Sequence, residues 1–318
     1  MCTPLPPRYL RAQAPARTIC SAARAGDNGR APLRHNLRAL LLLHLPMSTS
    51  KSPPDTPVPP QAQVAGTAAF SKFMHVLQLV ADADSPMNVA ALMRASGYPR
   101  PTVHRIVAAL TAEGLLVDNA HNNALALGPR LIQLASRSWG RSELRLAALD
   151  TLTRLRDQTG ETVHLAVPSG NAMVFIEKLE SPGAVRMSSG IGTTVSMHAT
   201  SVGKAYLAAL DEAAYHARLP LLPLPRRTAQ TVSTTDALDA LVREARERGW
   251  AMDDEENESG IVCFGAAIRN AQGEPIAAIS VSTLLFRQQP DIASAYIAPM
   301  QKAAQEISER IAHTPAIR

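Results

Sequence analysis

The feature that most constrains the fold is a series of three helix-forming segments followed at once by two short strand-forming segments. The first helix is predicted by apolar residues that recur every three or four positions and end near Asp82, which gives it one buried face made of Phe70, Phe73, Met74, Leu77 and Val80. A second helix is predicted over 89–96, because Asn88 can cap its start and Gly97 can end it.

The third helix follows a tight turn that contains Pro99 and Pro101, and it is predicted to run over 101–114. Its apolar face is formed by Val103, Ile106, Val107 and Leu110. Residues 115–117 and 124–127 are strand-like and flank the polar turn DNAHNN, which predicts a hairpin. Three helices and a hairpin predict a winged helix-turn-helix domain over 67–128.

Polar side chains gather at the start of the third helix, on the side away from its apolar face. Helix-turn-helix proteins place their base and phosphate contacts at this end of the recognition helix. Arg105 can bind guanine through two hydrogen bonds or hold a phosphate, and Thr102 suits a phosphate or a thymine methyl group. The alternative is that these residues are only the solvated side of an amphipathic helix. The predicted DNA-binding residues are Arg100, Thr102, His104 and Arg105.

A linker helix is predicted over 129–145, and a second domain over 146–318. The next helix, over 144–158, has apolar positions Leu146, Leu149, Leu152 and Leu155. This helix and the linker helix are candidates for a dimer contact. From Thr162 onward the pattern becomes α+β, which predicts a mixed sheet flanked by helices. Strands are expected over 162–167, 172–179, 249–253, 261–268 and 275–282, and helices over 203–210, 237–249 and 297–312.

The net charge of +5 does not by itself indicate a nucleic-acid-binding surface. Residues 1–46 hold seven arginines and one acid, whereas the remaining residues have a net charge of −1. We expect residues 1–46 to be an upstream extension, with translation starting at Met47; an organelle-targeting leader is the alternative. Residues 47–66 are rich in proline and are predicted to form a disordered tether.

Membrane-spanning, disulfide-rich and metal-binding classes are not favoured by the sequence. The apolar run 37–45 is far shorter than the roughly 20 residues that a membrane helix needs. Cys2, Cys20 and Cys263 form neither a disulfide framework nor a zinc pattern, so we expect a reducing, cytoplasmic setting with no metal and no cofactor. We also expect no membrane partner.

Four stretches taken together resemble one family. SGYPRPTVHRIVAALTAEGLL, LALGPRL, SMHATSVGKAYLAAL and RGWAMDDEENESGIVCFGAAI occur in the order and spacing of the IclR family of bacterial transcriptional regulators. The resemblance covers roughly residues 67–313. It implies a winged helix-turn-helix that binds a near-palindromic operator, a GAF-like domain that binds a small organic acid, and homodimers that pair into tetramers. The 46-residue leader departs from the short N-terminus that is usual in the family.

The second domain contains several residues suited to a small ligand. Ser201 and Gly203 lie at a helix start, where backbone N–H groups favour a carboxylate, although the stretch fails the pattern of a phosphate-binding loop at His198 and Ala205. Ser280 and Ser282 are two apart, so both point to one face of a strand. Without the resemblance, solvent-facing polarity on a half-buried strand is the alternative for this pair. The resemblance implies an effector pocket formed by Ser201, Val202, Asp253, Cys263, Ser280 and Ser282.

Two features of the second domain have competing interpretations. Cys263 alternates with apolar neighbours, which is also typical of a small buried hydrophobic residue. The acidic run 253–258 has no assignable partner for a metal, so we expect a solvated loop there. An effector-responsive regulator is the predicted function. The alternatives are an enzyme that uses Cys263 as nucleophile with His164 or His198 as base, and a DNA-binding protein without a ligand.

Overall fold

The computed structural model describes residues 67–119 and 124–313. The predicted extension 1–46 and tether 47–66 lie outside these residues, as does the tip of the predicted hairpin turn. Among the described helices, none is long and apolar enough to cross a membrane.

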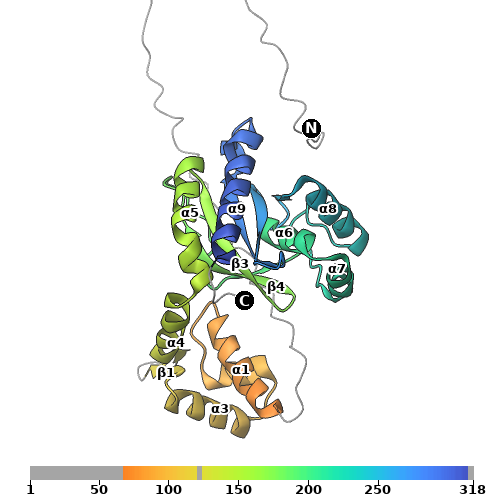
Figure 1. Cartoon of the computed structure of the whole chain (residues 1–318). Helices are drawn as coiled ribbons and strands as arrows, with labels where there is room; N and C mark the ends of the chain where they lie inside the picture. Colours follow the sequence, from red (N-terminus) through yellow and green to blue (C-terminus); the bar gives the residue numbers. More distant parts are fainter. Residues whose placement is uncertain (1–66, 120–123, 314–318) are drawn as a thin grey trace, which may run out of the picture. The chain divides into compact units, whose positions relative to one another are not determined.

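The first elements are the helices and hairpin that the sequence predicts. Asn88 accepts a hydrogen bond from the backbone of Ala91 and caps the second helix, which Gly97 ends in a left-handed conformation with φ of 69°. The two strands pair antiparallel, with Val117 opposite Ala126. The elements are α1 (Ala68–Ala81), α2 (Val89–Ser96), α3 (Arg100–Ala112), β1 (Leu116–Asn119) and β2 (Ala124–Leu127) (Figure 1).

The buried face of α1 differs from the prediction. Phe70 and Met74 are exposed, whereas Val76, Leu77 and Val80 are buried, with Phe73 packed against the same cluster. The three- and four-residue spacing predicts a helix, but it is compatible with burial of either of two neighbouring faces. The face that packs is the one that meets the apolar sides of α2 and α3, which contribute Leu92, Val103, Ile106 and Leu110.

Two helices follow the hairpin, α4 (Pro129–Gly140) and α5 (Glu143–Thr159). Helix α4 occupies the region predicted as a linker. Helix α5 packs beside α9 (Ala298–Ala312), as Figure 1 shows. This packing buries Leu152 and Leu155, so these two leucines belong to the core of the second domain, while Leu146 stays exposed. The dimer contact predicted for these two helices stays a prediction.

The second domain is built on a six-stranded sheet, among the described residues, with the order β5-β4-β3-β8-β7-β6. The α+β class is confirmed. All of its strand pairs in the described part of the chain are antiparallel, so the strand directions are not mixed as predicted. Short connections join β3 to β4, β6 to β7 and β7 to β8, and a short connection forces antiparallel pairing. The strands are β3 (Thr162–Ser169), β4 (Ala172–Leu179), β5 (Thr194–Ser196), β6 (Ala251–Asp254), β7 (Ile261–Arg269) and β8 (Pro275–Leu284).

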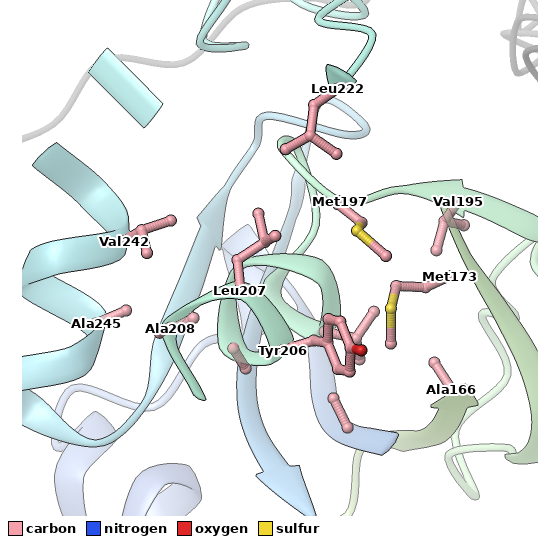
Figure 2. Close-up of a cluster of buried hydrophobic side chains, with 14 of the residues drawn as sticks. Ala166, Met173, Val195, Met197, Tyr206, Leu207, Ala208, Leu222, Val242 and Ala245 are labelled. Carbon is pink, nitrogen blue, oxygen red and sulfur yellow. The ribbon is translucent and has the colours of Figure 1, made fainter. Parts of the chain in front are cut away.

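Helices pack on the sheet and bury its apolar side chains. Helix α6 (Ser201–Ala209) packs on β7 and β8 and against α8 (Thr235–Arg248), while α9 also packs on β7. Helix α7 (Glu212–Arg218) and the three-residue strand β5 were not predicted. Figure 2 shows the cluster between the sheet and α6, in which Met173, Met197 and Tyr206 point toward one another. This core holds the start of α6 in a fixed position over the sheet.

Candidate functional site

A cavity of about 370 Å³ is lined mainly by residues of the second domain, beside the start of α6 and over strands β3, β4, β7 and β8. This volume falls in the range typical of small-molecule pockets, roughly 300–1,000 Å³. The six residues predicted to form a pocket all line this one cavity: Ser201, Val202, Asp253, Cys263, Ser280 and Ser282. The structure therefore brings together side chains that are as many as 81 positions apart in the sequence.

Strand register places three of these side chains side by side. Cys263 pairs with Ser282 across β7 and β8, and Ser280 lies two residues along the same face. The alternate residues Val262, Phe264 and Val281 are fully buried on the opposite side of the sheet. The predicted alternation is thus confirmed, and it gives the cavity a floor of two hydroxyls and one thiol.

Two close approaches hold the start of α6 against this floor. A Cβ atom on Gly265 of β7 would lie 2.5 Å from the backbone oxygen of Ser201, so only glycine fits there. A Cβ atom on Gly203 would lie 2.3 Å from the Cα of Met197. Thr200 caps the helix by accepting a hydrogen bond from the backbone N–H of Gly203 at 3.2 Å. The positive end of the helix is consequently directed at the cavity.

His164 is a cavity residue that sequence reasoning considered only as the base of an enzyme. It lies on β3 opposite Ser280, with its Nδ1 atom 3.4 Å from that hydroxyl and 3.5 Å from the hydroxyl of Ser282. Its Nε2 atom is 2.9 Å from Ser189 Oγ, and its ring stacks on Phe175 at 4.4 Å. Burial, helped by the charge of Lys178, lowers the pKa of His164 to about 3. The imidazole is therefore neutral at physiological pH.

The acidic run is only partly solvated, which corrects the prediction. Asp253 and Glu256 are buried, while Asp254, Glu255 and Glu258 are partly exposed. Asp253 accepts hydrogen bonds from the backbone N–H groups of Glu256, at 2.8 Å, and Asn257, at 3.2 Å. Glu256 forms an ion pair with Lys204 of α6, and both side chains are buried. The run folds back onto α6, which supplies a lysine 52 positions away. Burial raises the pKa of Asp253 to about 7, although Lys204 opposes the shift. No metal-binding group of three or more ligands occurs among the described residues.

The thiol of Cys263 is not activated. Burial, with a further contribution from the nearby Asp253 carboxylate, raises the pKa of the thiol well above its ordinary value. A thiol is nucleophilic as the thiolate, so a raised pKa suppresses its reactivity. Together with the neutral His164, this argues against a cysteine–histidine pair in the described cavity.

Arg227 is the only lysine or arginine among the described residues that line the cavity, and it was not among the predicted site residues. Its Nε–H group donates to the backbone oxygen of Asn257 at 3.3 Å, and its backbone N–H donates to Thr231 Oγ1 at 3.0 Å. These bonds hold the guanidinium at the wall of the cavity. Arg227 lies in a segment without regular secondary structure, so no helix or strand periodicity predicts where its side chain points.

Helix α3 presents the predicted polar side chains on one side. Arg100, His104 and Arg105 are exposed and Thr102 is partly exposed, while Val103 and Ile106 are buried. The Nε–H group of Arg100 donates to His104 Nε2 at 3.4 Å. In the described part of the chain, neither arginine forms a salt bridge. Both guanidinium groups are thus available to an anionic partner.

Comparison with known families supports both halves of this description. Residues 70–120 match the IclR helix-turn-helix domain, and residues 137–309 match the C-terminal domain of the bacterial transcriptional regulator IclR. The chain belongs to the IclR family of transcriptional regulators. The family confirms a two-domain transcriptional regulator with a DNA-binding helix-turn-helix and a C-terminal effector domain.

Individual relatives agree with the family assignment. The chain is 30% identical to the HTH-type transcriptional regulator XynR of Escherichia coli, over 77% of this chain and 97% of that protein. It is 28% identical to the transcriptional repressor IclR of the same organism, over 83% and 96%. Among solved structures, IclR of Thermotoga maritima matches with a TM-score of 0.61 and 27% identity, over 77% of this chain and 98% of that chain.

One further solved structure contains a ligand. It is an IclR homolog from Microbacterium hydrocarbonoxydans, complexed with 4-hydroxybenzoate, and it matches with a TM-score of 0.66 and 25% identity. The match covers 78% of this chain and all of that chain. An IclR-family protein of this fold therefore binds a small organic acid.

Proposed function

We propose that this IclR-family regulator senses a small organic acid in the cavity of the second domain, and that binding changes its affinity for operator DNA. The observation that carries the proposal is the convergence of the six predicted residues, from α6, β6, β7 and β8, on one cavity. The solved relative with 4-hydroxybenzoate supports the same ligand class.

The chemistry of the cavity fits an acid with a second polar group. The guanidinium of Arg227 and the start of α6 attract a carboxylate. The neutral His164, with Ser280 and Ser282, offers uncharged donors and acceptors for a hydroxyl or carbonyl group. Apolar walls between them are formed by Phe175, Val195, Val202 and Ile261.

The cavity is better suited to binding than to catalysis. A cysteine nucleophile needs a low thiol pKa and a basic partner, whereas the thiol of Cys263 has a raised pKa and His164 a strongly lowered one. The relatives are regulators, which agrees with this reading. We therefore propose that the chain acts by binding alone.

DNA binding is assigned to α3, which we propose enters the major groove. Arg105 and Arg100 would contact a guanine or phosphates, Thr102 a phosphate or a thymine methyl group, and His104 the adjacent backbone. A homodimer, or a pair of dimers, would span the half-sites of a near-palindromic operator. An effector that prefers one arrangement of the dimer then changes operator affinity, and a coupling of roughly 1–3 kcal/mol changes it about 5- to 150-fold.

The pocket is tested by a thermal-shift screen of the full chain against small carboxylic acids, including 4-hydroxybenzoate. A ligand that binds only the folded state raises its melting temperature. Replacing both Ser280 and Ser282 by alanine should remove the response. The matched control is Ser233→Ala, which removes the hydroxyl of an exposed serine outside the cavity. A panel with no stabilising acid, or an unchanged response in the double variant, contradicts the assignment of the pocket.

DNA binding is tested separately, with sequences selected by the full chain from a random duplex library. We expect the selected sequences to share an inverted repeat. Selection of no specific sequence contradicts the DNA-binding part of the proposal and leaves the ligand test standing.

A further inference from the structure

The hydrogen-bonded ladder between β3 and β4 is interrupted next to the cavity. Leu165 pairs with Glu177 and Ala166 pairs with Phe175, so Ile176 has no opposite residue and forms a β-bulge. Bulges commonly lie beside functional sites, where they change the direction of a strand and its side chains. The backbone oxygen of Ile176 accepts a hydrogen bond from the indole N–H of Trp139, on α4, at 2.8 Å.

Three consecutive residues of β4 thereby connect the cavity with α4. On one side of the bulge, Phe175 lines the cavity and stacks on His164. On the other side, Glu177 forms an ion pair with Arg145 of α5, with Oε2 and Nε 2.7 Å apart. The guanidinium of Arg145 lies over the indole ring of Trp139, 3.6 Å from its centroid.

The charged part of this connection is buried. The side chains of Arg145 and Glu177 are 11% and 6% exposed, so separating them would leave an uncompensated charge with little solvent. The cation–π contact and the indole hydrogen bond then hold Trp139 from two sides. Ile176 has no opposite residue on β3, whereas its neighbour Phe175 pairs with Ala166 and forms backbone hydrogen bonds with Thr193 and Gly192. Because Phe175 directly precedes Ile176 in the chain, a displacement of Phe175 is passed to the carbonyl that holds Trp139.

We propose that Trp139 is a positioning residue of the effector response, which reports the position of the cavity wall to helix α4 through the carbonyl of Ile176. Helix α4 directly follows the hairpin of the helix-turn-helix domain in the sequence, so the orientation of α4 affects the orientation of that domain. The effector part rests on the proposed function. The connection between Phe175 and Trp139 is a property of the chain itself and is testable without a ligand.

The first test uses tryptophan fluorescence, because the chain has only two tryptophans. Trp250→Phe in the full chain leaves Trp139 as the sole emitter. We expect Phe175→Leu in this background to raise acrylamide quenching of Trp139 by about twofold, because a shifted bulge loosens the indole contact. The control is Met173→Leu, a buried residue two positions along the same strand, outside the bulge. Equal quenching changes in the two variants, or no change in either, overturn the proposal.

A second variant keeps the proposal testable if Phe175→Leu does not fold. Glu177→Gln retains the shape of the side chain and removes its charge, which releases Arg145 from its ion pair. We expect the same rise in quenching of Trp139. A folded Glu177→Gln variant with unchanged quenching removes the charged part of the connection and contradicts the proposal.

The functional test is a double-mutant cycle in DNA affinity, measured with a sequence selected by the wild-type chain. Phe175→Leu and Trp139→Phe should be non-additive by roughly twofold or more in the dissociation constant. Trp139→Phe preserves an aromatic ring beneath Arg145 and removes only the indole donor. Additive effects mean that Trp139 is merely structural. Absence of DNA binding by the wild type defeats the proposed function, whereas the fluorescence test still decides whether the connection exists.

Discussion

Removal of Lys204 should destabilise the protein much more than removal of a typical surface charge. The Lys204 side chain is 2% exposed and its partner Glu256 is 8% exposed, so water cannot replace the lost ammonium group. Breaking a buried ion pair on one side typically costs about 3–5 kcal/mol. Lys204→Met keeps the length and apolar stem of the side chain. The expected loss therefore arises from the unpaired carboxylate and reduces the folding equilibrium constant by about two to four powers of ten.

The assay is urea unfolding of the full chain, monitored by circular dichroism. The slope of the unfolding free energy against urea concentration is compared between variants, because a changed slope means that more than stability has changed. The double variant Lys204→Met with Glu256→Leu removes both charges and should recover most of the loss. The matched control is Arg154→Met, which breaks the exposed pair with Glu306 and should cost about 1 kcal/mol or less. The reasoning is refuted if Lys204→Met costs no more than this control, or if the double variant is no more stable than the single one.

Three further predictions follow from the charges and pKa shifts of the described residues. Arg105→Ala should weaken binding to the selected DNA in a filter assay by about 1–3 kcal/mol, while Arg243→Ala, exposed on α8, should not; equal effects remove Arg105 from the contact set. The raised pKa of Asp253, about 7 against an ordinary 3.8, means that the unfolded chain loses this proton first, so stability falls as pH rises from about 4 to about 7. Asp253→Asn should reduce the change in the free energy of unfolding between these pH values, and an unchanged pH dependence contradicts the assignment. Alkylation of Cys263 at pH 8, followed by peptide mapping, should be slow until the protein unfolds, and rapid labelling of the native chain would contradict the raised pKa of its thiol.

Local sequence patterns correctly predicted helices and strands that bury a single apolar face. The third helix was correctly assigned because Val103, Ile106 and Leu110 mark its buried side, which leaves the arginines on the other. The same reasoning put Ser280 and Ser282 on one face of β8. It was less successful for α1, where Phe70 matches the helical period but lies outside the packed face. Periodicity fixes a helix, whereas the choice between adjacent faces depends on its neighbours.

The missed features depend on contacts between distant segments. His164 enters the cavity because β3 pairs with β8, a register that neither strand specifies alone. Glu256 of the acidic run is buried against Lys204 of α6, and the sequence offers no local sign of that partner. Trp139 gains its role from a single unpaired residue in β4. The resemblance to a known family supplied the six pocket positions, since strand alternation alone cannot bring four elements together.

The most direct test of the account is a titration of the full chain bound to its selected DNA with the acid that most raises its melting temperature. The account predicts that the acid changes the DNA dissociation constant by about 5- to 150-fold, and that DNA changes the dissociation constant of the acid by the same factor. The Ser280→Ala and Ser282→Ala double variant should bind DNA normally and lose this coupling. An acid that binds in the cavity but leaves DNA affinity unchanged would contradict the central claim that the cavity controls DNA binding.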